Sequence, residues 1–182
     1  AHKHIVRMPK DAGVTVQVMP TDLGKVFPIS GGLPLGKRAP QRQAYRLVEL
    51  KRFSDFLGIP MNVQPKFFPV SGDDASRLII ATDMALGSDA ALKLTGAILT
   101  ACWAQERNIA DPATLAALLE ECQLSADAVA QVPGASVQAR YDANTQVSID
   151  RGVFGAPSYV IDGEIFWGQD RLDFVQRKLQ SA

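Results

Sequence analysis

The sequence predicts an α/β protein in which strand segments near both ends flank a long run of helices. Residues 14–18 alternate in polarity and are rich in β-branched side chains, as is typical of a strand. Near the other end, Asp162-Gly163 joins two short apolar segments, which predicts a hairpin closed by a two-residue turn. Between these segments, caps and apolar residues spaced by three and four indicate helices.

The chain opens on residues that fit a helix already under way, because Ile5, Met8 and Ala12 have the spacing of one helical face. After the strand at 14–18, residues 21–38 are expected to form a loop. This expectation rests on closely spaced helix breakers, namely Pro28, Gly31, Gly32, Pro34 and Gly36.

The middle of the chain is expected to be helical. Pro40 suits the first turn of a helix over 40–57, where one stripe is formed by Tyr45, Val48, Arg52 and Phe56. A loop at 61–69 follows. Further helices are predicted at 73–86, from Gly87-Ser88-Asp89 to about Glu106, from Pro112 onward, after Ser125, and over 135–151.

Residues 152–172 carry the densest set of signals. Gly152 and Gly155 end the preceding helix, and Ala156-Pro157 opens the strand 158–161. Strand 164–167 returns after the turn and ends at Gly168. Gln169-Asp170 is expected to start the last helix, with the Asp170 carboxylate as its N-cap.

Composition limits the possible partners. Nineteen basic and nineteen acidic residues cancel in a chain of 182, so nothing predicts binding to nucleic acid or an anionic membrane. No apolar run approaches the roughly 20 residues of a membrane-spanning helix. Cys102 and Cys122 form no disulfide framework and are expected to be buried thiols in a reducing, cytoplasmic setting. His2 and His4 have no second ligand pair nearby, so no metal site is predicted.

Several motifs carry a family resemblance. They are Gly152-Val153-Phe154-Gly155-Ala156-Pro157, the run from Gly163 through Phe166-Trp167-Gly168 to Asp170-Arg171, the segment from Ala101 to Pro112 containing Trp103 and Ile109, Gly58-Ile59-Pro60, and Phe67-Phe68-Pro69. Together they resemble 2-hydroxychromene-2-carboxylate isomerases and kappa-class glutathione transferases of the DsbA-like thioredoxin superfamily. The resemblance implies a thioredoxin-like domain formed by residues 1–36 and 135–182, with an inserted all-helical domain at 37–134 and a cleft between the two.

The resemblance also implies a function. The expected activity is glutathione-dependent cis-trans isomerisation of 2-hydroxychromene-2-carboxylate-type compounds to trans-o-hydroxybenzylidenepyruvate, within aromatic hydrocarbon catabolism and in a homodimer. Three alternatives remain: a kappa-like glutathione transferase, a thiol-disulfide oxidoreductase of the same superfamily, and a non-catalytic binding module. Relatives carry a first strand and a catalytic serine ahead of the position of Ala1. That strand is therefore expected to be missing from this sequence, and a chain made as written is expected to have little activity.

The same resemblance implies a glutathione site. A cis bond before Pro157 would present the backbone of Ala156 to an extended peptide. The amides of Gln169 and Asp170 would hold the γ-glutamyl carboxylate, and the Asp170 side chain would pair with its ammonium group; a plain N-cap is the alternative for Asp170.

Other site residues are open. Arg42 is either a partner of the glycyl carboxylate or an exposed helix charge. Relatives have an asparagine where this sequence has Gly31-Gly32. Of Phe166 and Trp167, one is expected in the core and the other at the cleft edge, and Trp103 is either core or cleft wall.

Overall fold

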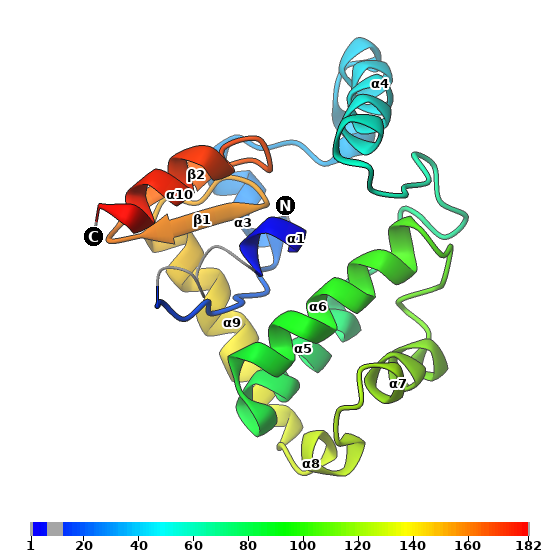
Figure 1. The fold of residues 1–182 in the computed structure, drawn as a ribbon, viewed down its shortest axis with the longest axis vertical. Coiled ribbons are helices and arrows are strands. Elements are labelled where there is room, and N and C mark those ends of the chain that lie inside the picture. Colours follow the sequence, from blue (N-terminus) through cyan, green and yellow to red (C-terminus); the bar gives the residue numbers. More distant parts are fainter. Residues whose placement is uncertain (1, 7–12, 182) are drawn as a thin grey trace.

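A computed structural model describes residues 2–6 and 13–181 of the chain. With the labels of Figure 1, the elements in chain order are α1 (His2–Ile5), α3 (Leu23–Ser30), the 3₁₀ helix η1 (Leu35–Lys37), α4 (Pro40–Leu57), α5 (Asp73–Leu86), α6 (Ser88–Trp103), α7 (Pro112–Glu121), α8 (Ala126–Ala130), α9 (Gly134–Asp150), β1 (Ser158–Ile161), β2 (Glu164–Trp167) and α10 (Leu172–Gln180). None of the described helices combines the length and the hydrophobicity that a bilayer crossing requires.

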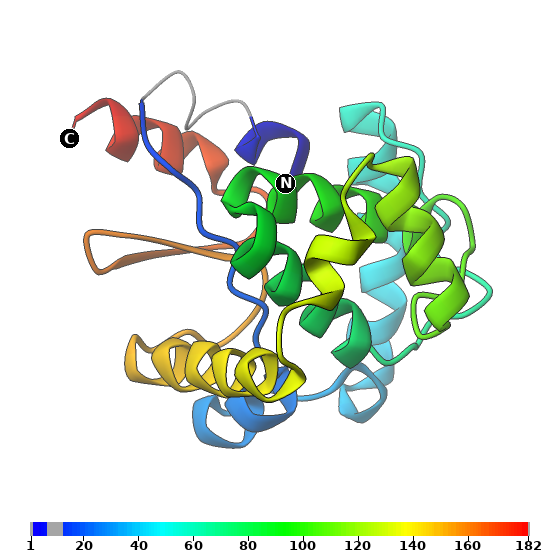
Figure 2. The ribbon, with the colours of Figure 1, turned by 90° about the horizontal axis from the view of Figure 1, so that it is seen from below.

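The described chain separates into a hairpin side and a helical side (Figure 1). The hairpin lies between α10 on one side and α9 on the other (Figure 2). Helices α5 to α8 form the helical side, and α4 stands apart from both (Figure 1). The described chain thus passes from the hairpin side to the helices and back to the hairpin (Figure 1).

The hairpin forms as predicted. β1 and β2 pair antiparallel, with Ser158 opposite Trp167 and Ile161 opposite Glu164. Asp162 and Gly163 both have positive φ angles, 51° and 81°, as a type I′ turn requires. The turn residues therefore fix the register, and Ser158 and Trp167 end up side by side at the open end of the hairpin.

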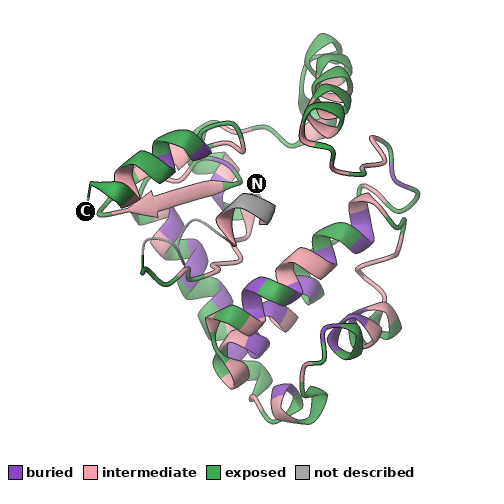
Figure 3. Cartoon of the chain, viewed as in Figure 1, coloured by how far each residue is buried: buried purple, intermediate pink, exposed green. Residues whose placement is uncertain are grey.

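The main hydrophobic core lies among the helices (Figure 3). Leu94 of α6 and Leu118 of α7 are almost completely buried, and α5 packs against α6 over most of its length. Val137 and Tyr141 of α9 belong to the same cluster. The helix that leads back to the hairpin therefore shares its core with the helical side, and the domain boundaries at 36/37 and 134/135 stay a prediction.

Residues before the helical side also contact α9. The Thr21 and Ser148 hydroxyl oxygens are 2.9 Å apart, and the backbone N–H of Asp22 donates to Thr145 Oγ1 at 3.0 Å. Val26 of α3 is buried, and α3 packs against α9. These contacts join the two ends of the chain around the helical segment.

Two expectations for the first forty residues are wrong. Residues 14–18 are not a strand: within the described part of the chain, only β1 and β2 form a sheet, so this alternating segment has no strand partner. Residues 21–38 are not all loop, because α3 and η1 form there. Asp22 Oδ1 accepts the N–H of Gly24 and starts α3, and Gly31 ends it at φ 74°.

The later helices match their predicted positions closely. α4 starts at Pro40 and ends at Gly58, which has φ 59°, and Asp111 caps α7 by accepting from the N–H groups of Ala113 and Thr114. α6 ends at Trp103, three residues before the expected Glu106, which itself has φ 54°. The predicted helix through Met8 and Ala12 lies outside the described residues.

Candidate functional site

The loop before β1 has an open backbone. The Ala156–Pro157 peptide bond is cis, as predicted, and both residues are exposed. Within the described part of the chain, neither the N–H nor the C=O of Ala156 makes a hydrogen bond. An unpaired donor and acceptor on one exposed residue can pair with an extended peptide, as at the edge of a sheet.

The loop after β2 lies beside this backbone. The N–H of Gly168 donates to the carbonyl oxygen of Pro157 at 2.9 Å, which joins the two loops at the open end of the hairpin. Beyond it, the N–H groups of residues 169–173 donate no hydrogen bond to any described residue. A run of free N–H groups at the start of α10 favours an anion, because the helix dipole adds positive potential there.

Asp170 does not take the N-cap position that the sequence predicts for it. The helix begins at Leu172, its N-cap position is Arg171, and no side chain caps it. The Asp170 carboxylate instead pairs with the guanidinium of Arg171 and folds back over Gly168. The expected N-cap role is therefore wrong, because the chain needs residues 168–171 to turn from β2 into α10. Asp170 stays exposed, so its carboxylate remains within reach of a ligand cation.

Trp167 and Phe154 form an aromatic wall at the same end of the hairpin. Their ring centroids are 5.0 Å apart at 57°, and Trp167 is 52% exposed. Trp167 Nε1 lies 2.7 Å from where a side chain on Gly155 would begin, so only glycine fits beneath the indole. Phe166, the neighbouring aromatic residue, is half-buried. Of the two neighbours, the exposed ring is therefore Trp167, and no local sequence pattern indicates its contact with Phe154.

Arg42 lies on α4, away from the other predicted site residues. Its side chain is exposed and makes no hydrogen bond or ion pair within the described ranges. Among the described residues, no hydrogen bond or ion pair joins Arg42 to the loops at 156–157 and 168–170. The structure thus brings together four of the five predicted binding residues, namely Ala156, Pro157, Gln169 and Asp170, while Arg42 stays separate.

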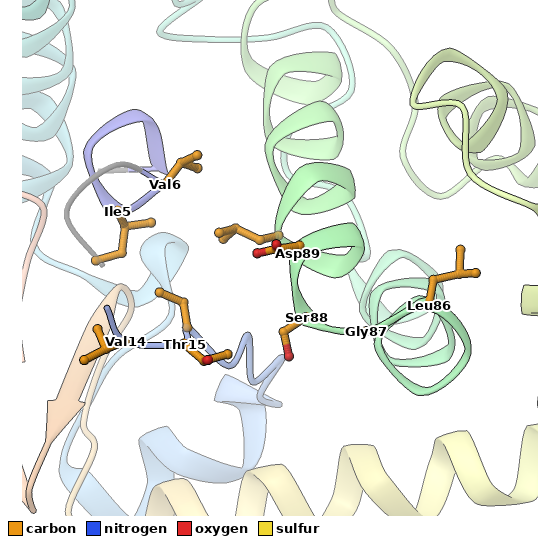
Figure 4. A pocket seen from close by; sticks show the side chains of 10 residues that line it. Ile5, Val6, Val14, Thr15, Leu86, Gly87, Ser88 and Asp89 are labelled. Atoms are coloured by element: carbon orange, nitrogen blue, oxygen red, sulfur yellow. The ribbon is translucent and has the colours of Figure 1, made fainter. Parts of the chain in front are cut away.

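A cavity of about 450 Å³ lies elsewhere, between α1, residues 14–16 and the start of α6 (Figure 4). Its walls are as polar as they are apolar: they include Ile5, Val14 and Leu92, and Asp89 supplies the one carboxylate among the described lining residues. None of the predicted site residues lines it. The candidate site is consequently an open surface at the end of the hairpin, whereas the cavity lies against the helical side.

The two cysteines are poor candidates for chemistry. Cys102 and Cys122 are free and buried, as the sequence predicts. Burial raises the pKa of both thiols, because a thiolate is poorly stabilised away from water. Neither thiol is suited to act as a nucleophile.

The fold and the site can be compared with known proteins. A hairpin with a cis proline at its entry, packed between helices, is typical of thioredoxin-like proteins, and the family model of the DSBA-like thioredoxin domain matches residues 1–180. The chain belongs to the family of DSBA-like thioredoxin domains.

Three curated relatives carry the name 2-hydroxychromene-2-carboxylate isomerase. The protein from Sphingobium xenophagum is 27% identical over 96% of this chain and 89% of its own length. The protein from Pseudomonas putida is 28% identical over 94% of this chain and 83% of its own length, and that from Pseudomonas sp. strain C18 is 28% identical over 100% and 84%. The solved structure of a selenomethionine-labelled 2-hydroxychromene-2-carboxylate isomerase superposes with a TM-score of 0.77 at 21% identity, covering 99% of this chain and 87% of that one. This likeness confirms the thioredoxin-like fold with its large helical part.

Proposed function

We propose that this protein is an isomerase that converts 2-hydroxychromene-2-carboxylate-type compounds and uses glutathione. The observation that carries the proposal is the match to three proteins named for that activity, each over at least 94% of this chain. The residues at the hairpin end that are predicted to bind glutathione present donors and acceptors that suit the polar groups of this tripeptide.

The residues at the hairpin end fit glutathione in three respects. The free N–H and C=O of Ala156 suit the peptide backbone of the ligand. The free N–H groups of residues 169–173 suit its γ-glutamyl carboxylate, and the exposed Asp170 carboxylate suits the ammonium group beside it. The Asp170 carboxylate is paired with Arg171 and can still accept hydrogen bonds from a ligand, because a carboxylate accepts several.

When bound, glutathione would supply a sulfur nucleophile for reversible addition to a conjugated double bond, which is chemistry that can serve cis-trans isomerisation. The protein's part is to hold the tripeptide along the loop, orient its thiol and leave the aromatic wall of Phe154 and Trp167 for an apolar group. The protein's own buried thiols do not compete for that role.

A turnover assay tests the proposal. The protein, extended by the first strand and serine expected ahead of Ala1, is mixed with 2-hydroxychromene-2-carboxylate, and the change in absorbance is followed without thiol, with glutathione and with S-methylglutathione. We expect acceleration with glutathione alone, because the methyl group removes the nucleophile and leaves the peptide intact. Equal rates in all three mixtures would contradict the proposal.

A further inference from the structure

Arg46 of α4 lies over two aromatic rings that come from other parts of the chain. Its guanidinium carbon is 5.4 Å from the ring centroid of Phe68 and 5.6 Å from that of Trp103. The two rings contact each other, with centroids 4.7 Å apart at 43°. Phe68 belongs to the loop after α4 and Trp103 ends α6, so this cluster forms only in the folded chain.

Arg46 has no counter-ion among the residues that the structure describes. Among the described residues, no carboxylate lies within 4 Å of its guanidinium, and its side chain donates no hydrogen bond. Arg77, Arg107 and Arg171 each have a carboxylate partner. A half-buried guanidinium without a partner is costly, and an anion would relieve that cost.

The surrounding charge is positive as well. Arg42 lies one helical turn before Arg46, and Arg38 lies just ahead of the helix. Burial, and after it the charge of Arg38, lowers the pKa of Arg46. In the described part of the chain, neither Arg38 nor Arg42 has an ion partner that would cancel this positive potential.

The hairpin points its open end, not its turn, toward the side of α4. β1 begins on the side of the molecule on which α4 stands and runs away from it, and the Asp-Gly turn is at the far side (Figures 1 and 2). The open end of the hairpin therefore faces the side on which α4, the helix that carries Arg46, stands (Figures 1 and 2).

We propose that Arg46, together with Phe68 and Trp103, binds an aromatic carboxylate. The guanidinium fork would hold the carboxylate by two parallel hydrogen bonds, and the aromatic pair would contact the ring of the ligand. This inference deepens the proposed function and rests on it in one respect, namely that the aromatic acid bound here is the substrate. Arg42 and Arg38 add attraction for the anion without forming the site.

The binding test uses trans-cinnamate and its neutral isostere trans-cinnamamide, titrated into the full protein without glutathione. Tryptophan fluorescence is followed in a Trp167→Phe background, which leaves Trp103 as the only indole. We expect cinnamate to change that fluorescence at saturation. Cinnamamide should bind about tenfold to a hundredfold more weakly, because it lacks the charge that the guanidinium requires.

Three variants separate binding from a structural role. Arg46→Gln should weaken the binding of cinnamate by about tenfold to a hundredfold. Arg46→Lys should bind cinnamate with an affinity between those of Arg46→Gln and the parent, because a lysine lacks the planar fork. The control Arg52→Gln, on the same helix and exposed, should bind as the parent does. Equal affinity for acid and amide, or unchanged binding by Arg46→Gln, would overturn the inference.

The turnover assay distinguishes this inference from the proposed function. If glutathione-dependent turnover occurs and Arg46→Gln leaves its KM unchanged, the inference fails and the function stands. If cinnamate binding needs Arg46 and no turnover occurs, the site stands and the function fails. Circular dichroism of each variant shows whether α4 is still folded, and Arg46→Lys, which keeps the charge over the rings, tests the site in a less disruptive way.

Discussion

At the scale of single residues, Gly168 holds the candidate site in shape. Its φ angle is 111°, a conformation that residues with a side chain rarely adopt. Its N–H bonds to Pro157, and the Asp170 carboxylate folds over the space where a side chain would begin. One small residue thus lets the two loops approach and places Asp170 beside them.

Replacing Gly168 by alanine should destabilise the protein. The new methyl carbon would lie 2.5 Å from Asp170 Oδ1 and the backbone would be strained, so we expect a loss of about 1–3 kcal/mol in the free energy of unfolding. Urea denaturation measures it. Gly134→Ala, at the first position of α9 with open space around it, is the matched control and should be neutral or slightly stabilising. Equal losses in both variants would contradict the account of Gly168.

Tyr159 of β1 predicts a pH dependence. Burial raises its pKa to about 12, from an ordinary value near 10. The folded protein therefore holds this proton more tightly than the unfolded chain does. The contribution of the Tyr159 phenol to the free energy of unfolding is fully present below pH 10 and is lost as the pH rises from 10 to 12.

The Tyr159→Phe variant should lose less stability over that window, as measured by urea denaturation at a series of pH values. Tyr45→Phe, which removes an exposed phenol of α4, is the control and should leave the slope unchanged. A slope that is the same for Tyr159→Phe and the parent would show that this phenol does not control alkaline stability.

At the scale of elements, α6 shows how one helix serves the core and the surface. Leu94 is completely buried, whereas Leu99 is 44% exposed. Leu94→Ala should lower the free energy of unfolding by about 2–5 kcal/mol, because it leaves a cavity between α6 and its neighbours. Leu99→Ala, the same change on the same helix, should cost less than about 1 kcal/mol. Denaturation of both variants measures the difference, and similar losses would mean that α6 packs differently.

Local signals predicted the elements whose formation depends on local chemistry. The Asp-Gly turn fixes the hairpin, and the Asp111 cap with Pro112 fixes the start of α7, since each needs only neighbouring residues. The prediction of a strand at 14–18 was wrong, because a strand depends on a partner that no local pattern reveals. The predicted start of α10 was wrong for a related reason: closing the loop at 168–171 outweighed the preference of Asp170 for an N-cap position.

α4 shows the limit of periodicity. Its three-and-four spacing correctly predicts a helix, but that spacing does not say what covers the helix. Tyr45, Val48 and Phe56 stay exposed, Phe56 to 83%, and none of its residues is buried. The contact that matters most, Arg46 over Phe68 and Trp103, joins segments up to 57 positions apart in the sequence (103 − 46), which no local pattern could predict.

At the scale of the whole molecule, the sequence motifs predicted a thioredoxin-like fold, and the family match confirms that fold. The shared core was beyond prediction: α9 packs on the helical side through Val137 and Tyr141 and also contacts the first residues of the chain through Thr145 and Ser148. These contacts follow from three-dimensional packing, which periodicity does not encode.

We propose that the hairpin end binds glutathione through its free amides and Asp170. Calorimetric titration of the full protein with glutathione tests it most directly, with Asp170→Asn and the control Asp162→Asn at the hairpin turn. We predict that glutathione binds, that Asp170→Asn weakens binding by about tenfold or more through loss of the charged contact, and that Asp162→Asn binds like the parent. No heat of binding to the parent protein, or equal affinities of both variants and the parent, would contradict the claim.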